Sequence, residues 1–316
     1  MAPRRSQSRQ KALRQGGAMP RPAAANGSTA TGRAPARRPS SRSYRAPRRS
    51  FWRGPYPYLG ILAVAVIVVV VVVLVAHLNT GSESTGNVRQ AIADATHVDS
   101  SIYNQVGTGS LVAGRLPIVL PKTPTAVTGA GGKPEVLYMG GEYCPYCAAD
   151  RWVMLTALSR FGSFRGVQSL FSSSTDAYPD TPTFTFLHAS YTSQYLDFVP
   201  VEMYSRTEPS DGTPNLEQPT AREQQLMTTY DSGGGIPFLL VGGRYVGSTP
   251  FVPSSLAGKT QQQVASALSD PSQQSTKDIV GNANLLAAAI CQVTGGQPAT
   301  VCASPGVQAA AKLLGG

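Results

Sequence analysis

The stretch Met139-Gly-Gly-Glu-Tyr-Cys144-Pro-Tyr-Cys147-Ala-Ala-Asp150 decides how this chain folds. Residues 135–139, just before the cysteines, are rich in β-formers and predict a short buried strand. After the second cysteine, apolar residues at helical spacing predict a helix that is stopped by Gly162. The Cys-x-x-Cys pair therefore stands between a strand and the first turn of a helix.

This placement favours a reactive first cysteine. The Sγ atom of Cys144 is expected near unpaired backbone N–H groups and the positive end of the helix dipole, which favour thiolate over thiol. Cys147 follows one turn later and can close a disulfide by attacking a mixed intermediate. We therefore interpret Cys144 and Cys147 as candidate catalytic residues of thiol–disulfide exchange. A structural disulfide or half of a zinc site is the alternative.

The positive charge of the chain is concentrated at one end. The 316 residues carry a formal net charge of +10, yet residues 1–53 hold thirteen Arg, one Lys and no Asp or Glu. The rest of the chain is therefore mildly acidic, and the basic pI describes a tail. Because this tail has almost nothing to bury, we expect it to be disordered. Nucleic-acid binding is the alternative for the tail, but the segment that follows explains the charges better, so we expect no nucleic-acid partner.

A long apolar run follows the basic tail. Residues 59–78 contain His77 as their only polar side chain, and twenty helical residues span about 30 Å of hydrocarbon. A lone span in lipid must satisfy its backbone internally, so a helix is expected despite the β-branched composition. We predict a single-pass anchor over residues 58–78, with a removable signal peptide as the alternative. The positive-inside rule then places the tail in the cytoplasm and the rest outside the cell membrane.

Three further parts are predicted after the apolar run. Residues 79–111 are rich in Gly, Ser, Thr and Asn and predict a linker that carries a domain off the membrane. Residues 112–294 are long enough for one domain with a sizeable core. Residues 295–316 are expected to form a C-terminal tail. Within the domain we expect strands near 116–120, 166–171, 183–188 and 195–204, and helices near 220–230, 260–268 and 276–292.

The segment around Pro237 is the second informative stretch. Pro237 stands at the start of the apolar run 238–241, a position where a strand tolerates proline. The Gly242-Gly243 pair then predicts a tight hairpin to residues 244–246.

A Gly-Ile-Pro sequence before a strand and a glycine hairpin, about 90 residues after Cys-x-x-Cys, resembles the thioredoxin superfamily. The resemblance implies an α/β thioredoxin-like fold, with a central mixed sheet flanked by helices. It implies that the Ile236–Pro237 bond is cis and lies against the Cys-x-x-Cys, and such a bond is inexpensive before proline. It also implies substrate binding by Ile236, Pro237 and Tyr146, and no cofactor.

Several positions depart from the thioredoxin pattern. Thioredoxins carry a buried acid six residues before the first cysteine, where this chain has Tyr138. Glu142 is the nearest candidate for proton transfer to Cys147, with an ordinary surface carboxylate as the alternative. The Pro-Tyr dipeptide is typical of glutaredoxins, but the chain lacks their glutathione-binding ending. Residues 176–218 are interpreted as an aromatic β insertion that a minimal thioredoxin does not have.

A second resemblance covers about residues 110–294. The pattern Gly-Gly-Glu-Tyr-Cys-Pro-Tyr-Cys-Ala-Ala, a Trp-containing helix, and the sequences Ser-Ser-Ser-Thr-Asp and Thr-Pro-Thr-Phe carry it. Together they look like a family of membrane-anchored actinobacterial and archaeal proteins called a domain of unknown function (929). This resemblance does not indicate what activity the chain has.

Two further cysteines lie near the C-terminal end. Outside the membrane, Cys291 and Cys302 most simply form a disulfide. Closing a loop of about a dozen residues would stabilise the fold by about 3 kcal/mol. A Cys₄ zinc site with Cys144 and Cys147 is the rival, but the long spacing and the Pro-Tyr filling argue against it. We therefore expect no metal.

Two functions follow from these patterns. The first is an enzyme, a membrane-anchored extracytoplasmic thiol–disulfide oxidoreductase whose partners are substrate proteins with thiols or disulfides. An oxidising compartment favours a disulfide donor or isomerase over a reductase, and a donor would need a quinone-linked membrane oxidase as partner. The second is a non-catalytic binding module, in which Cys144–Cys147 is a permanent disulfide and the aromatic insertion binds a partner. The reduction potential of the cysteine pair distinguishes the two.

Overall fold

The computed structural model describes residues 64, 66–71, 85–207, 212–247 and 253–315. The predicted disordered tail, 1–53, and most of the predicted membrane span, 58–78, lie outside these residues. The described residues of the span, Val64 and 66–71, are helical. Among the helices that the structure describes, none is both long and apolar enough to cross a bilayer.

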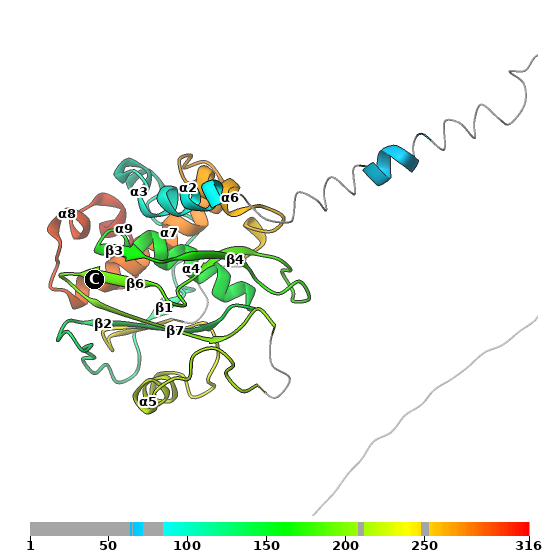
Figure 1. Cartoon of the computed structure of the whole chain (residues 1–316). Helices are drawn as coiled ribbons and strands as arrows, with labels where there is room; N and C mark the ends of the chain where they lie inside the picture. The colour runs from blue at the N-terminus through cyan, green and yellow to red at the C-terminus, as the bar shows by residue number, and fades with distance from the viewer. Residues whose placement is uncertain (1–63, 65, 72–84, 208–211, 248–252, 316) are drawn as a thin grey trace, which may run out of the picture. The chain divides into compact units, whose positions relative to one another are not determined.

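A five-stranded mixed sheet forms the centre of the folded part (Figure 1). Its strands, in spatial order, are β1 (Ile118–Val119), β9 (Tyr245–Gly247), β8 (Phe238–Val241), β2 (Glu135–Gly141) and β7 (Asp197–Tyr204). Strand β2 pairs in parallel with β7 and antiparallel with β8. Two two-stranded antiparallel sheets lie outside it, β3 (Gly162–Arg165) with β6 (Ser190–Ser193) and β4 (Gln168–Phe171) with β5 (Pro182–Thr185).

Helices flank the central sheet, as the sequence predicts. In chain order they are α2 (Thr85–Thr96), α3 (Ser100–Val106), α4 (Pro145–Leu158), α5 (Ala221–Tyr230), η2 (Pro253–Ser255), α6 (Gln261–Ala267), α7 (Gln274–Val293), α8 (Ala299–Cys302) and α9 (Pro305–Leu313). Figure 1 shows α4 and α7 on one side of the sheet and α5 on the other. The expected α/β class with a mixed, helix-flanked sheet is therefore confirmed.

Alternate residues of β2 face two separate apolar clusters, as the strand period of two requires. Val136 and Tyr138 belong to the larger cluster, which contains the apolar residues of α4 and α7. Leu137 and Met139 belong to the smaller cluster, together with Met227 of α5. Because both faces are covered, all of β2 is buried, and the chain that leaves it carries the cysteine pair out of a fixed strand.

The segments after α4 differ from the sequence prediction. Residues 166–171 were expected to form a second buried strand, but β4 lies in a peripheral two-stranded sheet. Part of the predicted insertion 176–218 is instead β7, the parallel neighbour of β2 in the central sheet. The reason is that α4 is buried along thirteen of its fourteen residues and needs a cover on the side away from the sheet. Strand β5 supplies this cover together with α7, and Trp152 Nε1 donates to Pro182 O of β5 at 2.8 Å.

Two segments predicted to lie outside the domain, as a linker and as a C-terminal tail, are folded. In the predicted linker 79–111, α2 and α3 bury Ala91, Ala95, Ile102 and Tyr103 in the main core. In the predicted C-terminal tail 295–316, α9 buries Val307 and Ala310 and packs against α3 and α7. These helices are short and contain few large apolar residues, so their periodicity is a weak signal. They are stable here because other helices offer them a surface, α6 and α4 to α2, and α7 to α3 and α9.

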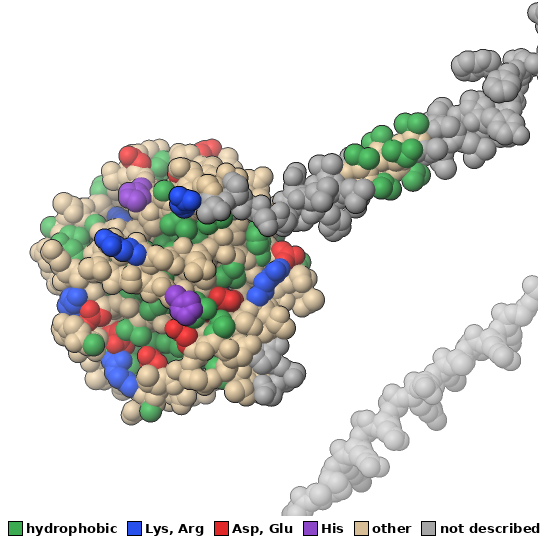
Figure 2. Space-filling view, viewed as in Figure 1, with side chains coloured by type: hydrophobic (Ala, Val, Ile, Leu, Met, Phe, Trp, Pro, Cys, Tyr) green, Lys and Arg blue, Asp and Glu red, His purple; other side chains and the backbone are tan. Residues whose placement is uncertain are grey.

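Charged side chains on the visible face of the folded part are mixed in sign. In Figure 2, the Lys, Arg, Asp, Glu and His side chains of this face stand singly or in small groups. This distribution fits the mildly acidic composition of the chain after its basic tail.

Candidate functional site

Cys144 is the residue at which β2 gives way to α4. It is the N-cap of α4 and has an extended backbone conformation, with φ −75° and ψ 122°. Pro145 occupies the first turn, where its missing N–H costs no helical hydrogen bond. The backbone N–H of Cys147 donates to Cys144 Sγ at 3.2 Å, so the sulfur takes the place of a capping oxygen. Cys144 and Cys147 are both free thiols in this structure.

The two thiols have different environments. A hydrogen bond from the Cys147 thiol lowers the pKa of Cys144, with help from backbone N–H groups and the charge of Arg151, against burial, which raises it. Burial raises the pKa of Cys147, and its hydrogen bond to Cys144 raises it further. Cys144 keeps a 6% exposure, whereas Cys147 has none. The pair therefore consists of an outer, more acidic thiol and an inner, less acidic one.

The Ile236–Pro237 segment lies at the same end of the central strands as the cysteines. Strand β8 runs antiparallel to β2, and its first residue, Phe238, pairs with Met139. The end of β2 that leads to Cys144 is therefore beside the beginning of β8. The Ile236–Pro237 peptide bond is cis, as the resemblance implies. Pro237 is buried and Ile236 half-buried.

Tyr146, the third predicted substrate-binding residue, stands between the two cysteines in the sequence. Its side chain is half-buried. Its ring meets that of Tyr178 edge to face, with centroids 5.9 Å apart. The preceding Tyr143 lines a polar hollow of about 690 Å³, together with the loop of residues 173–177 and Arg206. Tyrosine rings and a polar loop thus lie beside the turn that carries Cys144.

Glu142, predicted as a candidate for proton transfer, lies on the turn between β2 and α4. Its backbone N–H donates to Tyr204 O at 2.7 Å, and its side chain is half-buried. Burial raises the pKa of Glu142, while a hydrogen bond with Thr185 and the charge of Arg151 lower it. This carboxyl is therefore not an ordinary surface group.

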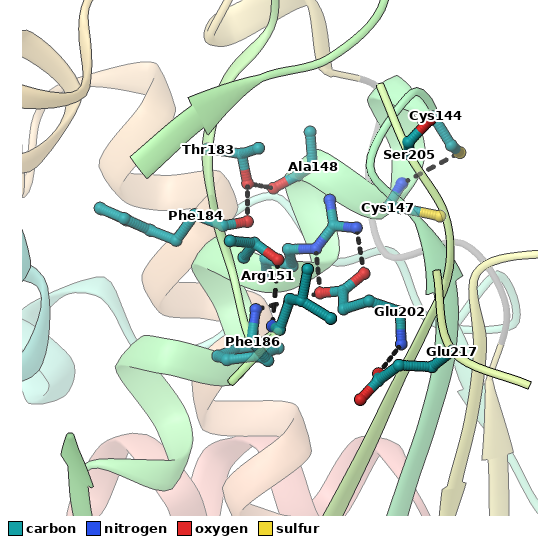
Figure 3. Close-up of polar contacts among 12 residues, drawn as sticks. Cys144, Cys147, Ala148, Arg151, Thr183, Phe184, Phe186, Glu202, Ser205 and Glu217 are labelled. Carbon is teal, nitrogen blue, oxygen red and sulfur yellow. Dashed lines mark hydrogen bonds and ion pairs between the residues drawn. The ribbon is translucent and has the colours of Figure 1, made fainter. Parts of the chain in front are cut away.

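A buried ion pair that the sequence analysis does not predict lies between α4, the helix of Cys147, and strand β7. Arg151 of α4 donates from Nε to Glu202 Oε1 at 2.8 Å and from Nη2 to Oε2 at 2.5 Å. Both side chains are fully buried. The backbone N–H of Phe186 also donates to Glu202 Oε1, at 3.1 Å. Figure 3 shows this network on the inner side of the helix turn that carries Cys147.

Asp150 is a third buried ionisable residue near the cysteine pair. Its exposure is 4%, and burial raises its pKa well above the usual range, with the charge of Cys144 raising it further and Arg151 opposing. A signal was available, because Asp150 and Arg151 interrupt a run of apolar residues in the predicted helix. Charges in such a helix are buried when the helix is covered on all sides.

The other cysteine pair lies elsewhere in the fold. Cys291 and Cys302 form a disulfide, with their Cα atoms 5.6 Å apart, at the end of α7. Val293, two residues after Cys291, lies against Gly242. Gly242 is at the end of the central strands opposite to the end where Cys144 lies. The structure therefore does not bring these cysteines to the candidate site. Within the described ranges, no cluster of three or more His, Cys, Asp or Glu side chains could hold a metal ion.

Most aromatic residues of the predicted insertion pack into or against the core. Phe184 and Phe186 are buried, and Phe186 stacks on Phe164 with centroids 5.5 Å apart. The remaining rings of this group are half-buried, namely Tyr178, Tyr191, Tyr195, Phe198 and Tyr204. These contacts give the rings a packing role.

Comparison with known proteins yields one family. The family model described as "Domain of unknown function (DUF929)" matches residues 126–292, which is more than half of the chain. The matched segment contains the Cys-x-x-Cys, the buried ion pair and the Ile236–Pro237 segment. No curated protein and no solved structure matches the chain. The chain belongs to the DUF929 family, a domain of unknown function.

Proposed function

We propose that this chain is a thiol–disulfide oxidoreductase with a thioredoxin-like fold. The observation that carries the proposal is the asymmetry of the Cys144–Cys147 pair. The outer sulfur caps a helix and accepts the N–H of Cys147, while the inner sulfur is fully buried one turn later. A nucleophile and a resolving thiol need this difference, because only the first must meet a substrate.

The arrangement of the neighbouring elements supports the fold part of the proposal. The unit β2–α4–β7 is parallel, and the antiparallel strand β8 follows a cis proline at the edge where Cys144 lies. Helices cover both faces of the sheet (Figure 1). In this reading Ile236 and Pro237 present the substrate chain, and Tyr146 forms part of the rim around Cys144.

The proposed exchange has two steps. The Cys144 thiolate attacks one sulfur of a substrate disulfide and forms a mixed disulfide with it. The substrate S–S bond breaks, and the other substrate sulfur leaves as a thiolate. Cys147 then loses its proton and attacks Cys144 Sγ, which releases the second substrate thiolate. The cysteine pair has lost two electrons and the substrate has gained them. The reverse sequence donates a disulfide to a substrate dithiol, after which a quinone-linked oxidase would reoxidise Cys144 and Cys147.

The direction of exchange follows from the proposed location. If residues 58–78 anchor the chain and the folded part lies outside the membrane, the oxidising compartment favours donation or isomerisation of disulfides. A cysteine placed in the basic tail, residues 1–53, should then stay shielded from an impermeant thiol reagent in intact cells. Labelling without lysis would contradict this orientation.

Trapping of intermediates tests the proposed function. We expect Cys147→Ser to accumulate mixed disulfides through Cys144, because the neighbouring thiol that would release the adduct is missing. Non-reducing electrophoresis and mass spectrometry of the adducts would identify the clients. The matched control, Cys144→Ser, should form none.

Two outcomes would favour the binding module instead. One is that Cys147→Ser traps nothing while the wild-type protein leaves a disulfide-containing peptide unchanged. The other is a reduction potential of the Cys144–Cys147 pair below about −300 mV, which is typical of structural disulfides.

A further inference from the structure

Arg151 stands one helical turn behind the resolving cysteine. Cys147 and Arg151 are four residues apart on α4, so their side chains share one face of the helix. Helical side chains lean toward the N-terminus, so the Arg151 side chain leans toward the turn that holds Cys147. Figure 3 shows both residues on this part of α4, with Glu202 facing the guanidinium from the neighbouring strand.

The guanidinium of Arg151 is only partly used by its ion pair. Nε and Nη2 both bind Glu202, so the fork of the guanidinium points at this carboxylate. Nη1 is buried and has no hydrogen-bond partner among the described residues. Leaving a buried charged donor unpaired is costly, and native proteins rarely do so without a reason. Figure 3 shows this third nitrogen turned away from Glu202.

The carboxylate of Glu202 binds a backbone N–H group as well as Arg151. Besides Arg151, Oε1 of Glu202 accepts the backbone N–H of Phe186 at 3.1 Å. The backbone of Glu202 is itself fixed, since its N–H donates to Glu217 Oε2 at 2.7 Å. The carboxylate is therefore fixed on β7, where it binds two nitrogens of Arg151 and leaves Nη1 unpaired among the described residues.

The groups that interact electrostatically with Cys147 or with Arg151 come from several elements. The titratable and charged ones are Tyr138 of β2, Glu142 of the following turn, Cys144, Asp150 and Arg151 at α4, and Glu202 of β7. Of these six, Arg151 alone carries positive charge. The Tyr138 hydroxyl is also buried without a hydrogen-bond partner in the described part of the chain, and the Arg151 guanidinium lies 5.8 Å from the Tyr138 ring centroid.

We propose that Arg151 is a positioning residue for thiol–disulfide exchange, whose fixed charge, anchored by Glu202, stabilises the thiolate of Cys147 inside the closed site. This inference rests on the function proposed above and adds to it a residue outside the Cys-x-x-Cys. Burial raises the pKa of Cys147, and the charge of Arg151 acts against that rise. The effect serves both directions of exchange. Cys147 is a thiolate when it attacks the mixed disulfide, and again when it leaves the Cys144–Cys147 disulfide.

A two-phase reaction separates the two cysteines. The full chain, reduced at Cys144 and Cys147, is mixed with 5,5′-dithiobis(2-nitrobenzoic acid) in a stopped-flow instrument over a range of pH. Attack by Cys144 breaks the S–S bond of the reagent, forms a mixed disulfide and releases the first thionitrobenzoate. Attack by Cys147 on Cys144 then forms the protein disulfide and releases the second. Cys147→Ser should remove the second phase, and Cys144→Ser should set the background.

Removal of the ion pair should slow the second phase. The double variant Arg151→Met/Glu202→Leu replaces both charges by apolar groups and leaves neither partner charged and unpaired. We expect the second phase to reach half of its maximal rate at a higher pH than in the wild-type protein. At pH 7 its rate should fall by about threefold for each unit of that displacement, because the lost thiolate fraction is partly offset by greater nucleophilicity.

Single variants distinguish charge from packing. Glu202→Gln keeps hydrogen-bonding capacity but removes the counter-charge, so it should move the second phase to lower pH. Arg151→Lys keeps the charge and should stay close to the wild-type profile. The matched control is Arg160→Met, because Arg160 lies just beyond α4, is bound to Asn284, and should leave both phases unchanged. Opposite displacements from two variants of one ion pair would not follow from loosened packing.

Each result decides the proposal. An unchanged profile in the double variant, or a displacement to higher pH in Glu202→Gln, would overturn the role of Arg151 while the proposed function stands. If the double variant does not fold, the direction of the displacement in Glu202→Gln decides alone. A wild-type protein without any second phase that depends on Cys147 would overturn the proposed function and this inference together.

Discussion

Asp150 shows how strongly burial shapes a single residue in this fold. Its carboxyl lies in a helix with almost no exposed surface, beside Arg151 and within reach of the charge on Cys144. Burial raises the pKa of Asp150, so the folded protein keeps a proton that the unfolded chain releases above about pH 4. The stabilisation from this proton is complete below the unfolded pKa and is lost as pH rises through the folded pKa.

We therefore expect Asp150→Asn to stabilise the protein at high pH. The amide cannot ionise, so the midpoint of thermal unfolding should exceed that of the wild-type protein at pH 8, and the difference should shrink toward pH 4. Asp270→Asn is the control of opposite sign, because hydrogen bonds from Ser272 and Gln273 lower the pKa of the exposed Asp270. Thermal unfolding of the three proteins at both pH values checks this. An Asp150→Asn variant equally destabilised at pH 4 and pH 8 would contradict it.

At the scale of elements, the close approach of α3 to α7 holds α3 on the core. The turn after α3 contains Gly107 and Gly109, with φ of +57° and +54°. A Cβ atom on Gly109 would lie 2.1 Å from the backbone oxygen of Lys277 in α7, whereas one on Gly107 would meet nothing within 4 Å. The two glycines share a positive φ and differ in what they contact.

Alanine at these two positions should therefore have unequal effects. Both variants incur the cost of a positive φ, about 1 kcal/mol. Gly109→Ala should lose a further ~1–3 kcal/mol, because α3 must move away from α7. Urea unfolding of Gly107→Ala and Gly109→Ala measures the difference directly. Equal free energies of unfolding for the two variants would show that the contact does not stabilise the fold.

At the scale of the whole molecule, the folded part extends beyond the segment that the family model matches. Helices α2 and α3 precede residue 126, and α8 and α9 follow residue 292. The hydroxyl of Tyr103 donates to Thr156 O of α4 at 3.0 Å, which ties α3 to the helix of the cysteine pair. At the other end, the Cys291–Cys302 disulfide connects α7 to α8.

Loss of this disulfide should destabilise the whole fold. The two cysteines are 11 positions apart in the sequence, and constraining a loop of this length in the unfolded chain corresponds to about 3 kcal/mol. We expect Cys291→Ala/Cys302→Ala to lower the free energy of unfolding by about that amount under non-reducing conditions. A reductant should lower the stability of the wild-type protein and leave that of the double variant much less affected. If the wild-type protein and the double variant are equally stable without reductant, the disulfide has no stabilising role.

Local chemistry accounts for the parts of the fold that the sequence predicts. The cap of α5 is one case, since Thr220 and Glu223 form the capping box that ends the preceding loop. The hairpin of β8 and β9 is another, because Gly242 and Gly243 both adopt a positive φ. The position of Cys144 between a strand and a helix also depends on neighbours within a few residues. For this reason the sequence by itself determined the cysteine pair, the strand beside it and the main helices.

Only the tertiary structure decided which distant segments meet. Arg151 and Glu202 are 51 residues apart, and the sequence pattern around each residue does not indicate that they form an ion pair. The same holds for β7 as the parallel partner of β2 and for α3 on the surface of α7. Hydrophobic periodicity predicts that one face of a helix or strand is buried, but it does not predict which element covers that face. The reason is that the free energy of burial depends on the apolar area removed from water and not on the identity of the covering element. The partner is selected by shape and charge complementarity, and these exist only when the whole chain is folded.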